Sequence, residues 1–142
     1  MRGLLRIVLL GAVLAIGAGT GGGALANEAM TGAVLDRHME AFGTGKVEVI
    51  LSNYAPDAVI VMPGGAKRGH AEIKGLFEAI LAEFGQPGVT FVVDHRTVAN
   101  EVAQIVWHAE TAKAVYPIGS DTFVVRDGKI VAQTVVFESK VR

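Results

Sequence analysis

The chain has 142 residues, of which 51% are hydrophobic and 19% are charged, and it contains no cysteine. This length is enough for one domain with its own hydrophobic core, and the composition is not that of a disordered chain. Without cysteine the chain can have no disulfide framework, no Cys-ligated zinc and no lipid-modified cysteine.

Residues 1–26 have the layout of a secretory signal peptide. Arg2 and Arg6 precede an uncharged run of Leu, Ile, Val and Ala, and the segment ends in the small-x-small cleavage pattern Ala24-Leu25-Ala26. Its densely apolar part, about residues 7–18, is shorter than the ~20 residues that a membrane span needs. We therefore expect cleavage after Ala26.

The mature domain is then residues 27–142, in the periplasm or outside the cell and not held at a membrane. Cleavage removes two arginines and no acid, which shifts the formal net charge from −1 to about −3. An acidic domain without clustered Lys and Arg is not expected to bind nucleic acid. Two alternatives are an uncleaved membrane anchor and a cytoplasmic protein that starts at Met30.

The first half of the mature chain has the spacing of helices. Residues 27–42 repeat apolar side chains every three or four positions, and His38 falls inside the apolar stripe. A second short helix is expected over residues 47–54, ended by Pro56, and a short strand over residues 57–62. The clearest helix comes next and ends at the sequence GQPG. Its apolar positions are Ile73, Leu76, Phe77, Ile80, Leu81 and Phe84.

After Gly88 the apolar period falls to about 2 residues, which indicates strands. Two long strands are expected over residues 89–100 and 101–112, around a tight turn near Asn100. The segment GSDTFVVRDGKIV, residues 119–131, predicts a β-hairpin because Asp-Gly separates two alternating runs. Together these elements predict an α+β fold with N-terminal helices packed on a curved, mostly antiparallel sheet.

Asp121 places a carboxylate on an apolar face of this hairpin. Residues two apart share a face of a strand, so Asp121 points the same way as Phe123. A two-residue loop at Asp127-Gly128 would set Asp121 opposite Thr134, whereas a three-residue loop would set it opposite Val135. One step of register moves every side chain of the second strand to the other face.

The segments NYAPDAVIVMPGG, RGHAEIKGLFEAI and SDTFVVRDGKIVAQTVVF resemble the nuclear transport factor 2-like superfamily. This superfamily includes ketosteroid isomerases and SnoaL-type polyketide cyclases, and the resemblance extends over about residues 31–138. It implies a cone-shaped α+β barrel with a deep apolar pocket, often a homodimer through the outer face of the sheet. Because the superfamily covers many reactions and many non-enzymes, function has to be inferred from the site.

The resemblance assigns positions in the pocket and favours the three-residue hairpin loop. Asp121 then lies where ketosteroid isomerases keep a protonated carboxylic acid that donates to an oxyanion, and His38 takes the position of their oxyanion-hole tyrosine. Met62 replaces their general base, and since methionine cannot take a proton from carbon, their mechanism is not expected here. The other expected pocket residues in these segments are Tyr54, Phe77, Phe123, Gln133, Val135 and Phe137.

The second long strand is expected to present alternate residues to the pocket. We predict that its pocket side carries Gln104, Val106, His108 and Glu110. Its outer side, expected in a subunit contact, then carries Ile105, Trp107 and Ala109.

The expected catalytic residues are Asp121 as acid or base, His108 as its partner or proton relay, and His38 as polariser of a substrate oxygen. An Asp–His pair facing an apolar cavity suits enolisation, aldol closure, dehydration or epoxide opening. No metal site and no cofactor is expected, because no His-x-x-x-His or similar ligand spacing occurs.

Two function classes fit these patterns. One is an exported, cofactor-independent acid–base enzyme of isomerase, cyclase, dehydratase or hydrolase type, acting on a small apolar molecule. The other is a non-catalytic pocket protein that binds a hydrophobic metabolite or serves as an assembly module. Met62 favours the second class, whereas an inward Asp121 with two pocket histidines favours the first. In the purely structural alternative, Asp121 is solvated, His38 is a core residue, and His108 pairs with Glu110.

Overall fold

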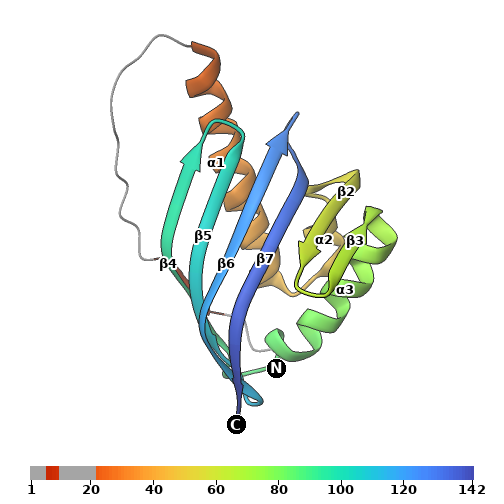
Figure 1. The fold of residues 1–142 in the computed structure, drawn as a ribbon, viewed down its shortest axis with the longest axis vertical. Helices are drawn as coiled ribbons and strands as arrows, with labels where there is room; N and C mark the ends of the chain where they lie inside the picture. Colours follow the sequence, from red (N-terminus) through yellow and green to blue (C-terminus); the bar gives the residue numbers. More distant parts are fainter. Residues whose placement is uncertain (1–5, 10–21) are drawn as a thin grey trace.

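The computed structural model describes residues 6–9 and 22–142, which form an α+β fold with helices packed on one face of a curved, open sheet (Figure 1). The sheet has seven strands in the order β1-β4-β5-β6-β7-β2-β3. Neighbouring strands are antiparallel except for β1 with β4 and β2 with β7. The elements are β1 (Arg6–Leu9), α1 (Gly22–Thr44), α2 (Val47–Leu51), β2 (Tyr54–Met62), β3 (Gly65–Arg68), α3 (Gly69–Phe84), β4 (Thr90–Ala99), β5 (Val102–Glu110), β6 (Ala114–Arg126) and β7 (Lys129–Val141). The predicted fold class is confirmed.

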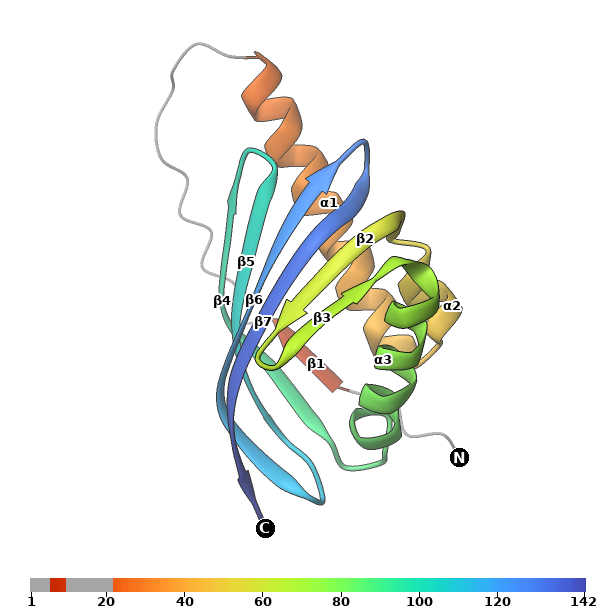
Figure 2. The same ribbon diagram turned by 45° about the vertical axis from the view of Figure 1, so that its right-hand side comes forward.

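The helices α1 and α3 lie on the concave side of the sheet (Figure 2). The helix predicted over residues 27–42 is longer than expected, since α1 already begins at Gly22. Its buried face starts at Thr31 and ends at Phe42, and His38 lies in the middle of that face. The helix therefore presents His38 to the space between the layers.

The second predicted helix is too long. The helix α2 ends at Leu51, and Tyr54 already begins β2, so Pro56 lies inside a strand and does not end a helix. The pairing of β2 with β7 shifts register between Tyr54 and Val59. Pro56 therefore falls where the ladder of hydrogen bonds is interrupted, and its missing N–H is tolerated there.

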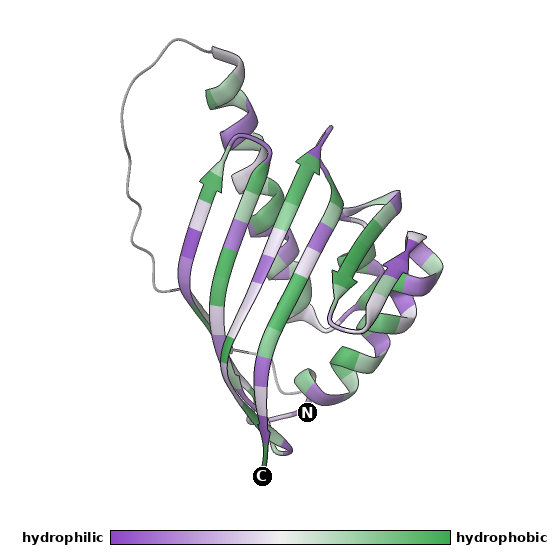
Figure 3. Cartoon of the chain, in the orientation of Figure 1, coloured by the Kyte–Doolittle hydropathy of each residue, from purple (hydrophilic) through white to green (hydrophobic). Residues whose placement is uncertain are grey.

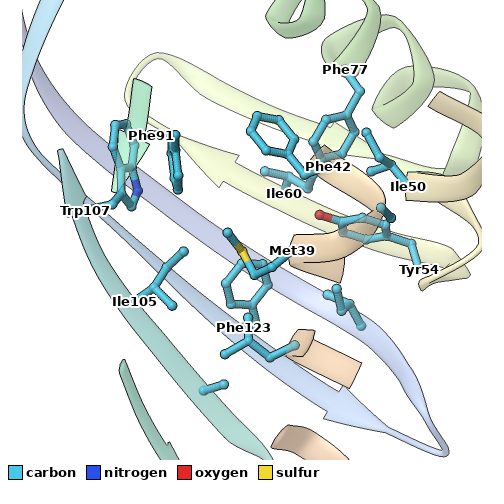
Figure 4. Packing of buried hydrophobic residues seen from close by; sticks show 14 of the residues in the cluster. Met39, Phe42, Ile50, Tyr54, Ile60, Phe77, Phe91, Ile105, Trp107 and Phe123 are labelled. Atoms are coloured by element: carbon cyan, nitrogen blue, oxygen red, sulfur yellow. The ribbon is translucent and has the colours of Figure 1, made fainter. Parts of the chain in front are cut away.

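Along β5 and β6, buried positions mostly alternate with more exposed ones. Figure 3 shows hydrophobic and hydrophilic bands along the strands of the sheet. The inward side chains of the sheet meet those of the helices in one hydrophobic core, part of which is drawn in Figure 4. The most deeply buried of its large members include Tyr54, Phe123, Leu35, Ile50, Ile60 and Ile73.

The hairpin of β6 and β7 combines features of both predicted loops. Its turn is the two-residue Asp127-Gly128, both with positive φ, and Arg126 pairs with Lys129. The three-residue loop is therefore wrong. A register shift between Val124 and Val125 adds one residue to β7, so that Asp121 nevertheless faces Val135 as predicted. The bulge supplies the step of register that the longer loop was expected to supply.

The predicted signal peptide lies partly outside the described residues, which omit 1–5 and 10–21. Of its described residues, 22–26 belong to α1, and Arg6–Leu9 form β1, which pairs in parallel with Thr90–Val93 at the edge of β4. Ile7 packs against the hydrophobic core. Within residues 6–9 and 22–142, no helix is both long and apolar enough to cross a membrane. Cleavage after Ala26 stays a prediction.

Candidate active site

A cavity of about 360 Å³ lies between α1, α3 and the inner face of the sheet. Its lining is mainly apolar, with aromatic rings from both helices and from β4 to β7. In Figure 4 the indole nitrogen of Trp107 and the hydroxyl of Tyr54 point toward each other from opposite sides of the core. The polar or ionisable side chains in the lining are His38, Glu83, Trp107, Tyr116, Asp121 and Gln133.

Asp121 is the centre of a buried network of hydrogen bonds, and only 8% of its surface is exposed. The indole Nε1 of Trp107 donates to Oδ2 of Asp121 at 2.5 Å, and Nε2 of Gln133 donates to Oδ1 at 2.6 Å. The hydroxyl of Tyr54 in turn donates to Oε1 of Gln133. We call these four residues the Asp121 network. Each of its donors is neutral, so no positive charge balances the carboxylate within it.

This environment shifts the pKa of Asp121 toward neutrality. Burial raises the pKa of Asp121 to about 6, and the hydrogen bonds from Trp107 and Gln133 oppose that shift only in part. Burial, and then the nearby charge of Asp121, also raise the pKa of Tyr54 well above its usual value. Tyr54 therefore stays a protonated donor, whereas Asp121 changes charge near neutral pH.

His38 lines the same cavity and is 4% exposed. Its ring meets those of Tyr54, Phe77 and Phe123 edge-on, with centroids 5.3–6.1 Å apart. Its Nδ1 is buried without a hydrogen-bond partner among the residues that the structure describes. Burial lowers the pKa of His38 to about 4, so the imidazole is neutral at physiological pH. It can bind a ligand oxygen or N–H without contributing charge.

Glu83 of α3 is a second carboxylate in the lining. Its Oε1 accepts hydrogen bonds from Thr111 Oγ1 at 2.7 Å and from the Tyr116 hydroxyl at 3.0 Å. Burial, and then the bond to Glu83, raise the pKa of Tyr116 to about 12. Glu83, like Asp121, is held by neutral donors.

The orientation of Trp107 depends on a glycine. Trp107 pairs with Gly119 across β5 and β6, and a Cβ placed on Gly119 would lie 2.2 Å from two carbon atoms of the indole. The indole therefore covers the bare Cα of Gly119, and from there its Nε1 reaches Asp121, two residues further along β6. No larger residue at position 119 allows this arrangement without movement.

The predicted faces of β5 are wrong. Ile105 and Trp107 line the cavity, and Ala109 is fully buried on the same side. The opposite side carries Gln104, Val106, His108 and Glu110, none of which lines the cavity. Alternation defines two sets of residues but not which one faces inward. The wholly apolar set faces inward because its burial is favourable.

His108 is therefore not the partner of Asp121. Its Nδ1 lies 2.8 Å from Oδ2 of Asp94 on the outer side of the sheet. Glu110, the alternative partner, instead accepts a hydrogen bond from Arg142. The residue that contacts Asp121 from β5 is Trp107, which we had expected in a subunit contact.

Apart from Val106, the other predicted site residues lie at or beside the cavity. Tyr54 contributes through its bond to Gln133, whereas Val106 faces away. Those found in the lining are His38, Met62, Phe77, Asp121, Gln133, Val135 and Phe137. Sequence reasoning missed Glu83, Tyr116 and Gly119. Glu83 follows Leu76 by seven positions and Ile80 by three, so it shares their face of α3, and that spacing was the available signal.

Residues 35–133 match the family model of the SnoaL-like domain. No curated protein matches the chain.

Solved structures share the fold at low sequence identity. The epoxide hydrolase/cyclase-like enzyme SalBIII, described for pyran ring formation in the polyether salinomycin, has a TM-score of 0.70 and 17% identity over 82% of this chain and 98% of that one. A putative ketosteroid isomerase from Kribbella flavida has a TM-score of 0.67 and 14% identity over 82% of this chain and 83% of that one. A putative polyketide cyclase from Sinorhizobium meliloti has a TM-score of 0.62 and 17% identity over 73% of this chain and 94% of that one. The chain thus belongs to the SnoaL-like domain family of the NTF2-like superfamily.

Proposed function

We propose that this protein binds a small, mostly apolar molecule in the cavity and catalyses a cofactor-independent proton transfer on it. The reaction is of the isomerase, cyclase, dehydratase or hydrolase type, as are those named for structures of similar fold. One observation carries this proposal: the carboxyl group of Asp121 is 8% exposed in a mainly apolar cavity, where burial raises its pKa to about 6. A group that exchanges protons near neutral pH is what general acid–base catalysis needs.

Asp121 is the group that takes up or releases the proton. As a carboxylate it accepts from both Trp107 and Gln133. Once protonated it needs an acceptor, and a rotation of the Gln133 amide supplies one. The amide oxygen then accepts from Asp121, while the amide nitrogen donates to the Tyr54 oxygen. The Asp121 network can therefore hold either protonation state.

His38 binds the substrate oxygen in this proposal. Its imidazole lines the cavity and is neutral, so a ring N–H can be offered to a ligand oxygen. A neutral imidazole stabilises a developing oxyanion by donating a hydrogen bond and does not compete with Asp121 for the proton. Met62 lines the cavity but has no proton to exchange.

Proton exchange with solvent tests this proposal without knowledge of the substrate. A bicyclic ketone such as 1-tetralone is first shown to bind by fluorescence of Trp107, and its α-protons are then followed by NMR in D₂O. We expect wild-type protein to accelerate deuterium incorporation and the Asp121→Asn variant to lose most of that acceleration. The matched control is His108→Gln, which changes a titratable group on the outer face. Equal exchange by wild type and Asp121→Asn would contradict the proposal.

A second candidate, binding without turnover, is favoured by one observation. Both oxygens of Asp121 already accept a hydrogen bond within the protein, which limits its reach toward a substrate. A bound ketone that gains no deuterium above the buffer rate would support this candidate.

We also propose export and a homodimer, on separate grounds. The N-terminal segment has the signal-peptide layout described above. The outer face of the sheet carries a row in which Val106 and Val136 flank Ser120, and Val136 is 56% exposed. An exposed apolar row on the outer face suits pairing with a second copy. Native mass spectrometry is expected to show dimers of chains that begin at Asn27, and monomers or chains that begin at Met1 or Met30 would refute these proposals.

A further inference from the structure

Two carboxylates in the cavity lack a charged partner. Asp121 accepts only from Trp107 and Gln133, and Glu83 only from Thr111 and Tyr116. Among the described residues neither forms a salt bridge, whereas six other acids do. The lining contains no Lys or Arg, and its histidine is neutral. Asp121 is buried, whereas Glu83 is partly buried. Buried charges in proteins are usually paired, so the environment of Asp121 requires an explanation.

The remainder of the lining is rich in aromatic rings. A cation over the face of such a ring is attracted to it, most strongly for Trp and when water is excluded. Trp107 and Phe91 are 4.9 Å apart between ring centroids, and Tyr116 and Phe137 are 5.4 Å apart. Further rings in the lining come from Phe42, Phe77, Phe84 and Phe123. The cavity thus combines uncompensated acids with the side chains that best hold an organic cation.

We propose that the ligand of this cavity is an organic cation with an apolar body, such as a hydrophobic protonated amine or a quaternary ammonium compound. This inference rests on the proposed function, because it names the substrate class of the same site. The cation supplies the counter-charge that Asp121 and Glu83 lack. An anion would be buried beside two carboxylates without a compensating group, and is rejected.

His38 supplies an independent observation in the same cavity. It is 4% exposed, and its Nδ1 has no partner among the described residues. Because its imidazole is neutral, His38 adds no repelling charge beside a bound cation. The histidine is therefore compatible with the same class of ligand as the two acids.

Three compounds of similar shape but different charge distinguish the effect of ligand charge on binding from that of ligand size. Benzyltrimethylammonium, neopentylbenzene and benzylsulfonate share a benzyl group and a tetrahedral head that is positive, neutral and negative, respectively. Trp107 is the single tryptophan of the chain and lines the cavity, so its fluorescence reports binding. We expect the cation to bind about tenfold more tightly than its neutral isostere. The anion is expected not to bind.

Variants that remove one negative charge test which residues cause the preference for the cation. Glu83→Gln and Asp121→Asn are each expected to weaken binding of the cation about fivefold or more, and to leave the affinity for neopentylbenzene unchanged. Unchanged binding of the neutral compound also shows that each variant is folded. The matched control is Glu78→Gln on the same helix, since Glu78 is exposed and pairs with Lys74 outside the cavity.

The outcomes distinguish this inference from the proposed function. If neopentylbenzene binds as tightly as the cation or more tightly, the inference is refuted and the apolar pocket stands. If none of the three compounds binds, the pocket itself is refuted. If Glu78→Gln weakens cation binding as much as Glu83→Gln, general surface charge explains the preference, which also refutes pairing inside the cavity.

Discussion

Replacing Gly119 by alanine tests how the fold holds the carboxylate of Asp121. The added Cβ would lie 2.2 Å from Cε2 and Cζ2 of Trp107 and 2.6 Å from Cη2. Ordinary carbon–carbon contacts are about 3.5–4.0 Å, so the indole has to move by more than about 1 Å. The φ of Gly119 is not positive, and alanine therefore fits its backbone without strain. The whole effect has to come from displacement of the indole or of the two strands.

Two terms set the size of the effect. Overpacking of a core position costs about 1–3 kcal/mol. Movement of the indole also breaks the bond from Nε1 to Asp121, and a hydrogen bond to a charged group is worth about 1.5–3 kcal/mol. We expect the free energy of unfolding to fall by about 2.5–6 kcal/mol. The pKa of Asp121 should rise further, since one of the two hydrogen bonds that lower it is lost.

Chemical denaturation measures the first effect, and the pH dependence of Trp107 fluorescence measures the second. The control is Gly75→Ala on α3, where nothing lies within 4 Å of the added Cβ. In the interior of a helix that change should stabilise by about 0.5–1 kcal/mol. A Gly119→Ala variant with wild-type stability and an unchanged fluorescence midpoint would refute the proposed support of Asp121 by Trp107.

Three further predictions concern the neighbours of this contact. The pKa of Asp121 is about 6 in the folded state and 3.8 ordinarily, so the stability that Asp121 contributes is lost as pH rises from about 4 to 6. The pKa of His38 is about 4 in the folded state and 6.5 ordinarily, so the stability that His38 contributes grows over nearly the same pH range. In the wild type these two dependences of stability on pH should nearly cancel. Urea denaturation should therefore show stability rising with pH in Asp121→Asn and falling with pH in His38→Gln. Parallel stability profiles in all three proteins would contradict this. Tyr54→Phe removes the donor to Gln133 and should cost about 1–3 kcal/mol in urea denaturation without loss of the fold. His108→Gln, on the outer face, should change stability by less than about 0.5 kcal/mol and leave the fluorescence titration of Trp107 as in the wild type.

Periodicity predicted the elements well where one pattern dominated. The apolar positions of α3 recur without interruption, and the structure buries Ile73, Phe77 and Phe84 as that spacing requires. The turn at Asn100 was also predictable, because the residue there has a φ of 51° and Asn tolerates that conformation. Such signals are local, and they depend little on the rest of the fold.

The faces of β5 were not predicted correctly, because that choice is not local. Burial alternates along β5 without interruption, so the sequence defines two sets of residues, and which of them faces the helices depends on packing against the rest of the fold. The hairpin shows the same limit in a milder form. Asp121 was placed correctly although the loop was wrong, because a bulge beyond Val124 restored the register. Bulges arise from tertiary packing and twist, which one sequence does not reveal.

The Asp121 network also bears on why a domain would keep an acid in its core. Burial shifts the pKa of Asp121 from 3.8 to about 6, which corresponds to roughly 3 kcal/mol of lost stability above pH 6. An apolar core at this point, with the hydrogen-bonding partners of Asp121 replaced as well, would avoid that loss. The fold instead holds the carboxylate with three side chains and leaves the glycine space that one of them needs. Local destabilisation that so many residues maintain is typical of sites under functional selection, and it supports placing the chemistry of this protein at Asp121.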